Sequence, residues 1–232
     1  MPGPYTSYGT LVYVDGRVGS WRVTLPHVFR RFDFEELPVL VLEPEIREAE
    51  TISPLVLFLH GSGERGVDGW SALRHGLPRI AGRPEVALVR IAVPQCPPGE
   101  RWSEWVDPLA SLLDALGSER AVVTGFSMGG RGAWAFALRH SARVLRLSPV
   151  AARLPPETTA SELALALPPV PTWVVHSRDD ERVPVSESDA AFAALAAVGR
   201  PPRYTRYEGL SHTATSETAY ADGEYLTWLS AP

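Results

Sequence analysis

The segment Gly-Phe-Ser-Met-Gly at 125–129 places Ser127 between two glycines, each two positions away. A serine hydroxyl becomes a nucleophile when a neighbouring base takes its proton. An apolar, β-branched run precedes this segment and an Ala-rich stretch follows it, which is typical of a strand that turns at once into a helix. Such a turn strains the backbone of Ser127, and side chains at Gly125 and Gly129 would collide. The alternative is an ordinary glycine-rich turn between a strand and a helix.

Six histidines could provide the base: His27, His60, His75, His140, His176 and His212. His212 follows the last expected strand, in a loop at the carboxyl end of the sheet, where the turn at Ser127 also lies. The others precede the sheet, fall on expected helices, or end strands, where we expect them to support the loops that follow. We therefore predict His212 as the base, the alternative being an exposed loop histidine.

A catalytic imidazole needs a carboxylate that fixes its tautomer and stabilises its charged form. Three adjacent acids, Asp179, Asp180 and Glu181, follow an expected strand. A charge run is usually a solvated loop, but this one lies at the carboxyl end of a central strand, where sites form. Ser127, one of these acids and His212 then follow one another in the order nucleophile, acid, base.

Attack on a carbonyl also requires hydrogen-bond donors for the oxygen that becomes negative. We expect one donor to be the backbone N–H of Met128, at the start of the helix. We expect the other to be the N–H of Ser62, in the loop His-Gly-Ser-Gly-Glu-Arg-Gly at 60–66, where two glycines let the backbone curl toward Ser127. The alternative is a phosphate-binding loop, but no lysine follows it.

Alternating strand and helix patterns must position these groups. We expect strands at 54–60, 86–93, 120–126, 144–150, 172–176 and 203–207, and helices at 70–80, 107–116, 129–140, 186–198 and 216–229. This order predicts an α/β fold with a mostly parallel central sheet and helices on both faces. Only 21 residues separate the fourth and fifth strands, so we expect no separate cap domain and an open cleft.

The first 50 residues are different in pattern. Strand candidates at 11–14 and 17–24 flank Asp15-Gly16, a favourable hairpin turn, and 37–42 is a further strand candidate. We expect these to form an antiparallel edge on the parallel sheet, with 47–53 as a polar connection. Residues 1–232 are predicted to form one domain, with edge strands in 1–50 and the catalytic core in 54–232.

Composition excludes several function classes. The net charge is −5 and no dense basic run occurs, so we expect no nucleic-acid partner. All 22 basic residues are arginine, which removes Schiff-base and P-loop chemistry. We expect no cofactor and no metal, and Cys96, the single cysteine, is predicted to be structural. The chain has no signal-peptide pattern and no apolar run of 18 residues, so we expect a cytoplasmic protein without a membrane partner.

Five motifs occur in one order: LFLHGSGERG at 57–66, PQCP at 94–97, GFSMGGRGAW at 125–134, HSRDDERVPV at 176–185 and GLSH at 209–212. Over residues 54–232 the chain resembles the α/β-hydrolase superfamily, in particular its single-domain carboxylesterase/phospholipase-like and predicted-peptidase esterases. In that family the acid lies three residues before a Val-Pro pair, so the resemblance implies Asp180 rather than Asp179. Ser177 departs from the family pattern, which usually has glycine there.

These features together predict a serine hydrolase that cleaves small to medium carboxylic esters through an acyl-enzyme. A serine peptidase or thioesterase of the same fold, and a non-catalytic binding module, are the alternatives. Tryptophans in loops near the site, with Leu154, could bind the substrate; simple packing of large side chains is equally compatible with the sequence. The tryptophans are Trp70, Trp102 and Trp105. A small-molecule ester is the expected partner, and a homo-oligomer is possible.

Overall fold

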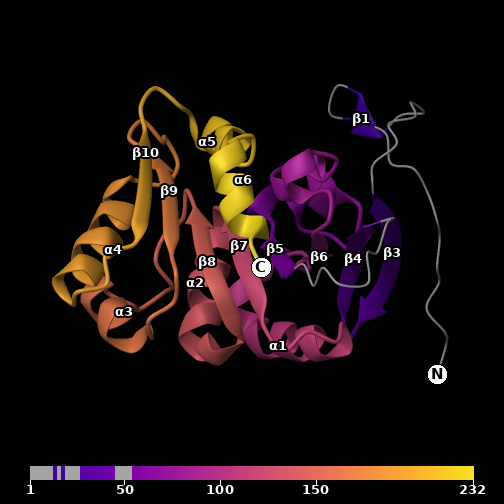
Figure 1. Ribbon diagram of the computed structural model, residues 1–232, viewed down its shortest axis with the longest axis horizontal. Coiled ribbons are helices and arrows are strands. Elements are labelled where there is room, and N and C mark those ends of the chain that lie inside the picture. The colour runs from indigo at the N-terminus through magenta and orange to yellow at the C-terminus, as the bar shows by residue number, and fades with distance from the viewer. Residues whose placement is uncertain (1–12, 15–16, 19–26, 45–53) are drawn as a thin grey trace.

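The computed structural model describes residues 13–14, 17–18, 27–44 and 54–232, and an eight-stranded sheet runs through it in the order β10-β9-β8-β7-β5-β6-β4-β3 (Figure 1). The strands from β5 to β10 pair in parallel, whereas β4 pairs antiparallel with β6, and β3 antiparallel with β4. The strands of this sheet are β3 (His27–Phe34), β4 (Leu37–Pro44), β5 (Leu55–Leu59), β6 (Arg90–Pro94), β7 (Ala121–Phe126), β8 (Val144–Val150), β9 (Trp173–Ser177) and β10 (Arg203–Tyr207). The predicted α/β fold with an antiparallel edge is confirmed.

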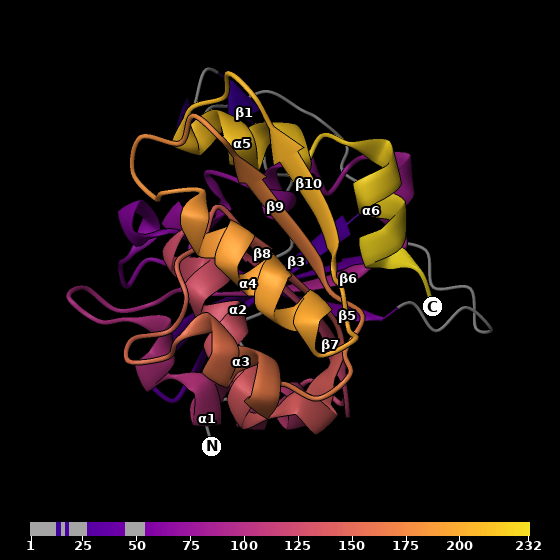
Figure 2. The same ribbon diagram turned by 90° about the vertical axis from the view of Figure 1, so that its left-hand side faces the viewer.

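Helices cover both faces of the sheet. The α-helices are α1 (Val106–Ala115), α2 (Met128–Arg139), α3 (Ala160–Ala166), α4 (Ser186–Ala197), α5 (His212–Ala219) and α6 (Gly223–Ser230). Figure 2 shows α2, α3 and α4 on one side of the strands and α6 on the other. No helix in the described part of the chain is long and apolar enough to cross a membrane.

The two-residue period of the strands divides the core between the two faces. On β5, Leu55 and Leu57 pack into the core under α1 to α4, while Val56 and Phe58 pack into the core under α5 and α6. All five residues of β5 are buried, as expected for a strand covered on both sides. The strand next to it, β7, is equally buried and ends at the predicted turn.

The six predicted core strands are present, but the strand expected at 86–93 begins later. A 3-10 helix, Pro84–Val86, ends at the first residue of the expected strand, and the observed strand spans only Arg90–Pro94. The N–H of Val86 donates to the carbonyl of Arg83 and the N–H of Val89 donates to that of Val86, so these backbone groups close turns rather than pair with a strand.

The prediction of one helix at 70–80 is wrong, because the segment forms two 3-10 helices, Ser71–Leu73 and Leu77–Ile80. Gly76 interrupts it with φ +71° and ψ −149°, a conformation outside the helical region that glycine adopts readily. A Cβ at Gly76 would lie 2.5 Å from the Phe58 ring, so the turn also needs glycine for space.

The prediction of a single helix at 216–229 is also wrong, because two helices, α5 and α6, occupy this region. The Asp222 side chain accepts hydrogen bonds from the N–H groups of Glu224 and Tyr225 at 2.8 and 3.0 Å. Asp222 therefore caps a new helix and separates it from α5. The short α3 was not predicted, and α1 begins at Val106, one residue before the expected start at 107.

The N-terminal edge differs in part from the prediction. The strand expected at 37–42 is present as β4, but its antiparallel partner β3 was missed in the sequence. The predicted hairpin pairs β1 (Tyr13–Val14) with β2 (Arg17–Val18), yet these strands form a separate two-stranded sheet instead of joining the main one. The expected polar connection at 47–53 lies outside the described residues.

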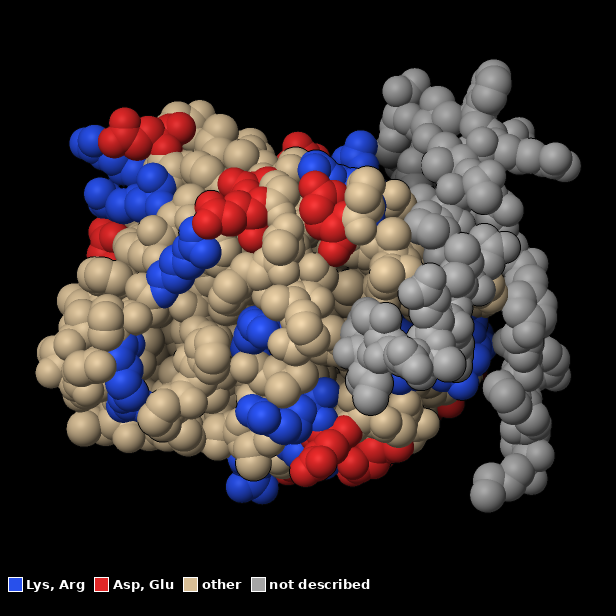
Figure 3. All heavy atoms as spheres, viewed as in Figure 1, with Lys and Arg blue, Asp and Glu red and all other residues tan. Residues whose placement is uncertain are grey.

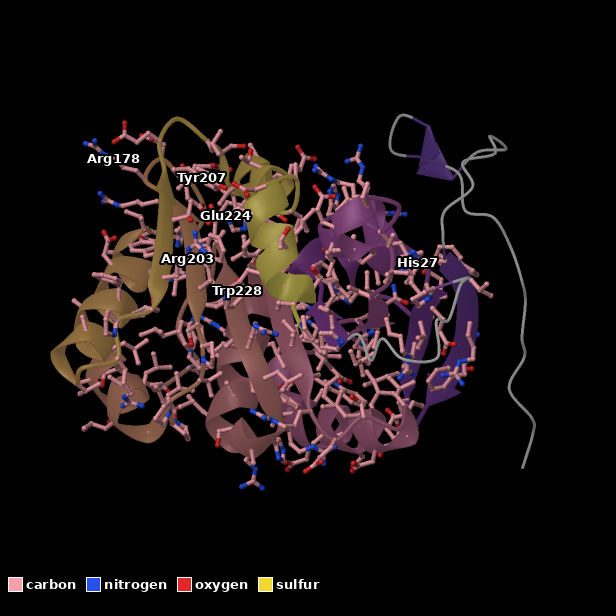
Figure 4. The ribbon with its side chains drawn as sticks, in the orientation of Figure 1. His27, Arg178, Arg203, Tyr207, Glu224 and Trp228 are labelled. Carbon is pink, nitrogen blue, oxygen red and sulfur yellow. The ribbon has the colours of Figure 1, made fainter. Side chains whose placement is uncertain are left out.

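The last helix is fixed against the far edge of the sheet by polar and aromatic contacts (Figure 4). Arg203 on β10 forms an ion pair with Glu224 on α6, and its guanidinium lies 3.6 Å from the ring centroid of Trp173. Trp173 in turn contacts Trp228 edge to face at 5.5 Å. Trp173 and Arg203 are the first residues of β9 and β10, so this packing holds α6 against the amino ends of these two strands.

Candidate active site

Ser127 stands at the junction of β7 and α2 in the strained conformation expected from the sequence. Its φ is +56° and its ψ −113°, and its N–H donates to the carbonyl of Val150 at 2.9 Å. A Cβ at Gly125 would lie 2.5 Å from the carbonyl carbon of Gly129, and one at Gly129 only 1.8 Å from the carbonyl oxygen of Leu59. Both glycines are therefore required by close backbone approach.

His212 lies beside this turn and is joined to Asp180. The Nδ1–H of His212 donates to Oδ2 of Asp180 at 2.7 Å, which leaves Nε2 with a free lone pair that can accept a proton. The imidazole packs against the ring of Phe126, the residue before Ser127, with 4.6 Å between ring centroids. His212 is buried and is the first residue of α5, not a loop residue as the sequence indicated.

Each of the three adjacent acids holds a different part of the segment that carries His212. Asp179 accepts from the N–H of Gly209 at 2.7 Å, and Glu181 accepts from the N–H of His212 at 2.9 Å. Asp180 binds the imidazole itself. The acidic run therefore positions the histidine segment from three sides, and the sequence could not distinguish this from a solvated loop.

Asp180 is kept in its charged form by hydrogen bonds. Its side chain is fully buried, and its Oδ1 accepts from the N–H groups of Arg182 and Val183, both at 2.9 Å. Burial alone would raise its pKa, but the bonds from His212, Val183 and Arg182 outweigh burial and lower the pKa below its ordinary value. Asp180 is thus an anion that can stabilise a positively charged imidazole.

His176 contacts the same carboxylate, a role that sequence reasoning missed. Its Nε2 lies 3.2 Å from Oδ2 of Asp180 and 3.0 Å from the carbonyl of Val183, and its Nδ1 lies 2.7 Å from the hydroxyl of Ser188. Burial lowers the pKa of His176, which keeps it neutral. As expected from its place at a strand end, it holds the following loop, and it also orients Asp180.

The two residues expected to donate to a developing oxyanion, Ser62 and Met128, both border one cleft with Ser127. Ser62 is the first residue of a 3-10 helix, Ser62–Glu64, and Met128 is the first residue of α2. An N–H at the first position of a helix has no acceptor within that helix. Neither N–H donates to another residue that the structure describes, so both can bind an oxygen in the cleft.

A buried histidine fixes the loop that carries Ser62. The Nδ1–H of His60 donates to the carbonyl of Gly61 at 2.6 Å, and its Nε2 accepts from the N–H of Cys96 at 2.9 Å. Burial lowers the pKa of His60 to about 4, so the ring is neutral. Trp102 adds a further restraint, because its Nε1–H donates to the carbonyl of His60 at 3.0 Å.

The cleft measures about 210 Å³, and of the four residues expected to bind substrate only Trp102 lines it. Trp70 is partly exposed beside a neighbouring 3-10 helix, Trp105 is buried with its indole N–H on Glu100, and Leu154 packs against the core. The rest of the cleft lining, beside Ser62, Trp102, Ser127 and Met128, is largely basic. It comprises Arg65, Arg101, Ser103, Arg131, Gly132, Arg153 and Val183.

One of these residues had a signal in the sequence. Arg131 stands four positions after Ser127, which is about one helical turn, so both residues lie on one face of α2. Gly132 follows Arg131 on α2, whereas the others come from separate segments, and their meeting at one cleft is a consequence of the fold.

Fold and site together define a hydrolase. The sequence profile of the alpha/beta hydrolase fold matches residues 54–228, and the chain belongs to that family.

Curated relatives and solved structures agree with this assignment. The chain is 35% identical over 111 residues to the 2-hydroxy-6-oxo-2,4-heptadienoate hydrolase of Pseudomonas putida, which covers 46% of this chain and 40% of that protein. It is also 35% identical over 97 residues to a 2-hydroxymuconate semialdehyde hydrolase of a Pseudomonas species, covering 40% and 34%. The chain therefore spans well under half of the length of these relatives.

Among solved structures, a thermostable esterase superposes with a TM-score of 0.73 and 26% identity, over 88% of this chain and 62% of the esterase. The feruloyl esterase module of Clostridium thermocellum superposes with a TM-score of 0.69 over 96% and 95% of the two chains, but at 11% identity, so this likeness concerns the fold alone.

Proposed function

We propose that this hydrolase cleaves carboxylic esters through an acyl-enzyme formed on Ser127. The observation that carries the proposal is the 2.7 Å hydrogen bond from His212 to the buried Asp180, next to the strained turn that presents Ser127. An imidazole oriented by a carboxylate beside a serine is the arrangement that activates a hydroxyl.

The proposed reaction has two steps. Nε2 of His212 takes the hydroxyl proton as Oγ of Ser127 attacks the ester carbonyl, and Asp180 stabilises the resulting imidazolium. The N–H groups of Ser62 and Met128 bind the oxyanion, and the alcohol leaves with the proton from His212. Water then attacks the acyl-serine with the same base, which releases the acid and restores the serine.

Replacement of the nucleophile tests the proposal. We expect Ser127→Ala to lower kcat for p-nitrophenyl esters by about 10⁴- to 10⁶-fold, because no other group can form the acyl-enzyme. A fluorophosphonate probe should label the wild-type chain and not the variant. Ser111→Ala, an exposed serine on α1, is the matched control and should keep full activity and labelling.

Two results would contradict the proposal. The first is esterase activity in Ser127→Ala equal to that of the wild type, with an unchanged circular dichroism spectrum. The second is a folded wild type that neither hydrolyses esters nor reacts with the probe, which would favour a binding module. A panel of p-nitrophenyl esters from acetyl to palmitoyl, aminoacyl anilides and acyl-thioesters separates esterase from peptidase and thioesterase.

The curated relatives favour a second candidate, hydrolysis of 2-hydroxy-6-oxo-2,4-heptadienoate, for which the Pseudomonas putida relative is named. The match of 35% identity covers less than half of either chain, so we include this compound in the substrate panel and keep esters as the proposed substrates. Turnover of this compound at a higher kcat/KM than any ester would replace the esterase proposal.

A further inference from the structure

Four arginines border the cleft beside Ser127: Arg65, Arg101, Arg131 and Arg153. No Asp or Glu is among the cleft-lining residues in the part of the chain that the structure describes. This local excess of positive charge opposes the composition of the whole chain, which has 22 basic and 27 acidic residues. On the face shown in Figure 3, basic and acidic side chains instead lie close to one another.

Protein groups neutralise these four charges only in part. Nε of Arg65 donates to the carbonyl of Glu100 at 2.6 Å, which binds the guanidinium but leaves its charge. Arg153 lies 3.7 Å from the carboxylate of Glu187, and within the described part of the chain this is the one ion pair that the four arginines form. The guanidinium of Arg131 forms neither a hydrogen bond nor an ion pair with any described residue.

The surroundings of Arg131 disfavour its positive charge. Partial burial lowers the pKa of its guanidinium; the charges of Arg153 and Arg101 lower it further, while Glu187 acts in the opposite direction. Like charges held together at a half-buried site repel one another, and an anion between them would relieve this repulsion. The N-terminal turn of α2, which carries Arg131, adds a further preference for negative charge.

Arg131 is also within reach of the reacting group. It lies one helical turn beyond Ser127, and its N–H donates to the carbonyl of Ser127 at 3.0 Å. Ser127 and the four arginines line the same cleft, which measures about 210 Å³. An ester bound at Ser127 therefore places its other end among the arginines when it is only a few carbon atoms long.

We propose that the natural ester carries a second, anionic group, a carboxylate, which Arg131 binds together with Arg101 and Arg153. A planar guanidinium matches a carboxylate with two parallel hydrogen bonds, and such charge-assisted bonds are the strongest that side chains form. This inference rests on the proposed esterase function. The carboxylate belongs either to the acyl part or to the alcohol part of the ester, and the binding chemistry is the same.

Paired substrates test the inference on the wild-type enzyme. Mono-p-nitrophenyl glutarate is compared with p-nitrophenyl pentanoate for a carboxylate on the acyl part, and 4-acetoxybenzoate with 4-acetoxybenzamide for one on the alcohol part. We expect kcat/KM of the charged ester to exceed that of its neutral partner at least tenfold in one pair. Added salt should reduce this ratio, because salt screens the attraction.

Variants then assign the preference to its residue. Arg131→Met keeps the apolar stem and removes the charge, and we expect it to lower the ratio of charged to neutral kcat/KM by about 10- to 100-fold, mainly through KM. Arg131→Lys should recover part of the ratio. Arg139→Met is the matched control: Arg139 ends the same helix, far from the cleft, so the ratio should stay at its wild-type value.

The outcomes separate the two proposals. If neutral esters are hydrolysed and Ser127→Ala abolishes the activity, but neither pair favours the charged ester, the anionic substrate is refuted and the esterase stands. The anionic substrate is also refuted, and the esterase stands, if Arg131→Met and Arg139→Met change the ratio of charged to neutral kcat/KM equally. If no ester is hydrolysed and the probe does not react, the esterase proposal fails and this inference fails with it.

Discussion

Among the described glycines, Gly129 leaves the least room for a Cβ atom, and Gly129→Ala tests this close backbone approach beside Ser127. The added Cβ would lie 1.8 Å from the carbonyl oxygen of Leu59, 2.4 Å from its carbonyl carbon and 2.8 Å from the carbonyl oxygen of His60. Ordinary contacts of a carbon atom are about 3.5–4.0 Å, so β5 and α2 would have to separate by roughly 1.5 Å or more.

The free-energy cost of this separation depends on whether side-chain or backbone atoms must move. Overpacking a core costs about 1–3 kcal/mol when side chains can adjust. Here the obstacle is the backbone at the end of β5, which is paired with β6 and β7 and cannot turn away. We therefore expect Gly129→Ala to lower the free energy of unfolding by about 3 kcal/mol. In a chain of this length that corresponds to a fall in Tm of roughly 6–12 °C.

Thermal unfolding followed by circular dichroism, with urea unfolding at 25 °C, measures the effect. Gly63→Ala is the matched control: the same exchange is made in a nearby loop, where an added Cβ meets no atom within 4 Å. Its free energy of unfolding should change by no more than about 0.5 kcal/mol. A Tm of Gly129→Ala within 2 °C of the wild type, or equal losses in both variants, would refute the reasoning.

Two further predictions concern buried groups beside the site. Burial lowers the pKa of His60 to about 4 in the folded chain. As pH falls below about 6.5, this imidazole is therefore protonated in the unfolded chain but stays neutral in the folded chain. The stability that the neutral His60 contributes is thus complete above about pH 6.5 and lost as pH falls toward 4. The free energy of unfolding should fall by up to about 3 kcal/mol over this window. In His60→Gln the free energy of unfolding should fall by less over the same window. Equal slopes in urea titrations of both proteins would contradict this. Burial raises the pKa of the Cys96 thiol to about 12, so 5,5′-dithiobis(2-nitrobenzoate) should modify it at about pH 8 only in the unfolded chain; rapid reaction of the native chain would show that Cys96 is accessible.

Local patterns were enough to predict most elements of the sheet. The segments that became β5, β7 and β9 are largely apolar because both faces of these strands are covered, and such runs are visible without any structure. The two helix predictions that are wrong, at 70–80 and 216–229, fail because of single residues. Gly76 and Asp222 interrupt otherwise helical patterns, the first by a positive φ and the second by capping a new helix.

The N-terminal strands show a different limit. A strand at the edge of a sheet carries a mixed pattern, and β3, with the sequence HVFRRFDF, has polar and apolar residues without a strict alternation. Its pairing with β4 joins neighbouring segments, but the pairing of β4 with β6 joins residues about fifty positions apart. Only the folded sheet decides such a contact.

The sequence by itself showed the turn around Ser127, because glycines two positions before and after a serine, between an apolar run and a helical pattern, are visible without a structure. Only the fold shows that Gly129 must admit the backbone of Leu59, which lies seventy positions earlier in the chain. The sequence also determined the order of the serine, the acids and His212 along the chain. The tertiary structure alone decided that Asp179, Asp180 and Glu181 divide three tasks around one histidine segment, and that four arginines face one cleft. Those contacts join loops that are distant in sequence, and charge repulsion and hydrogen bonding between them arise only when the sheet brings its loops together.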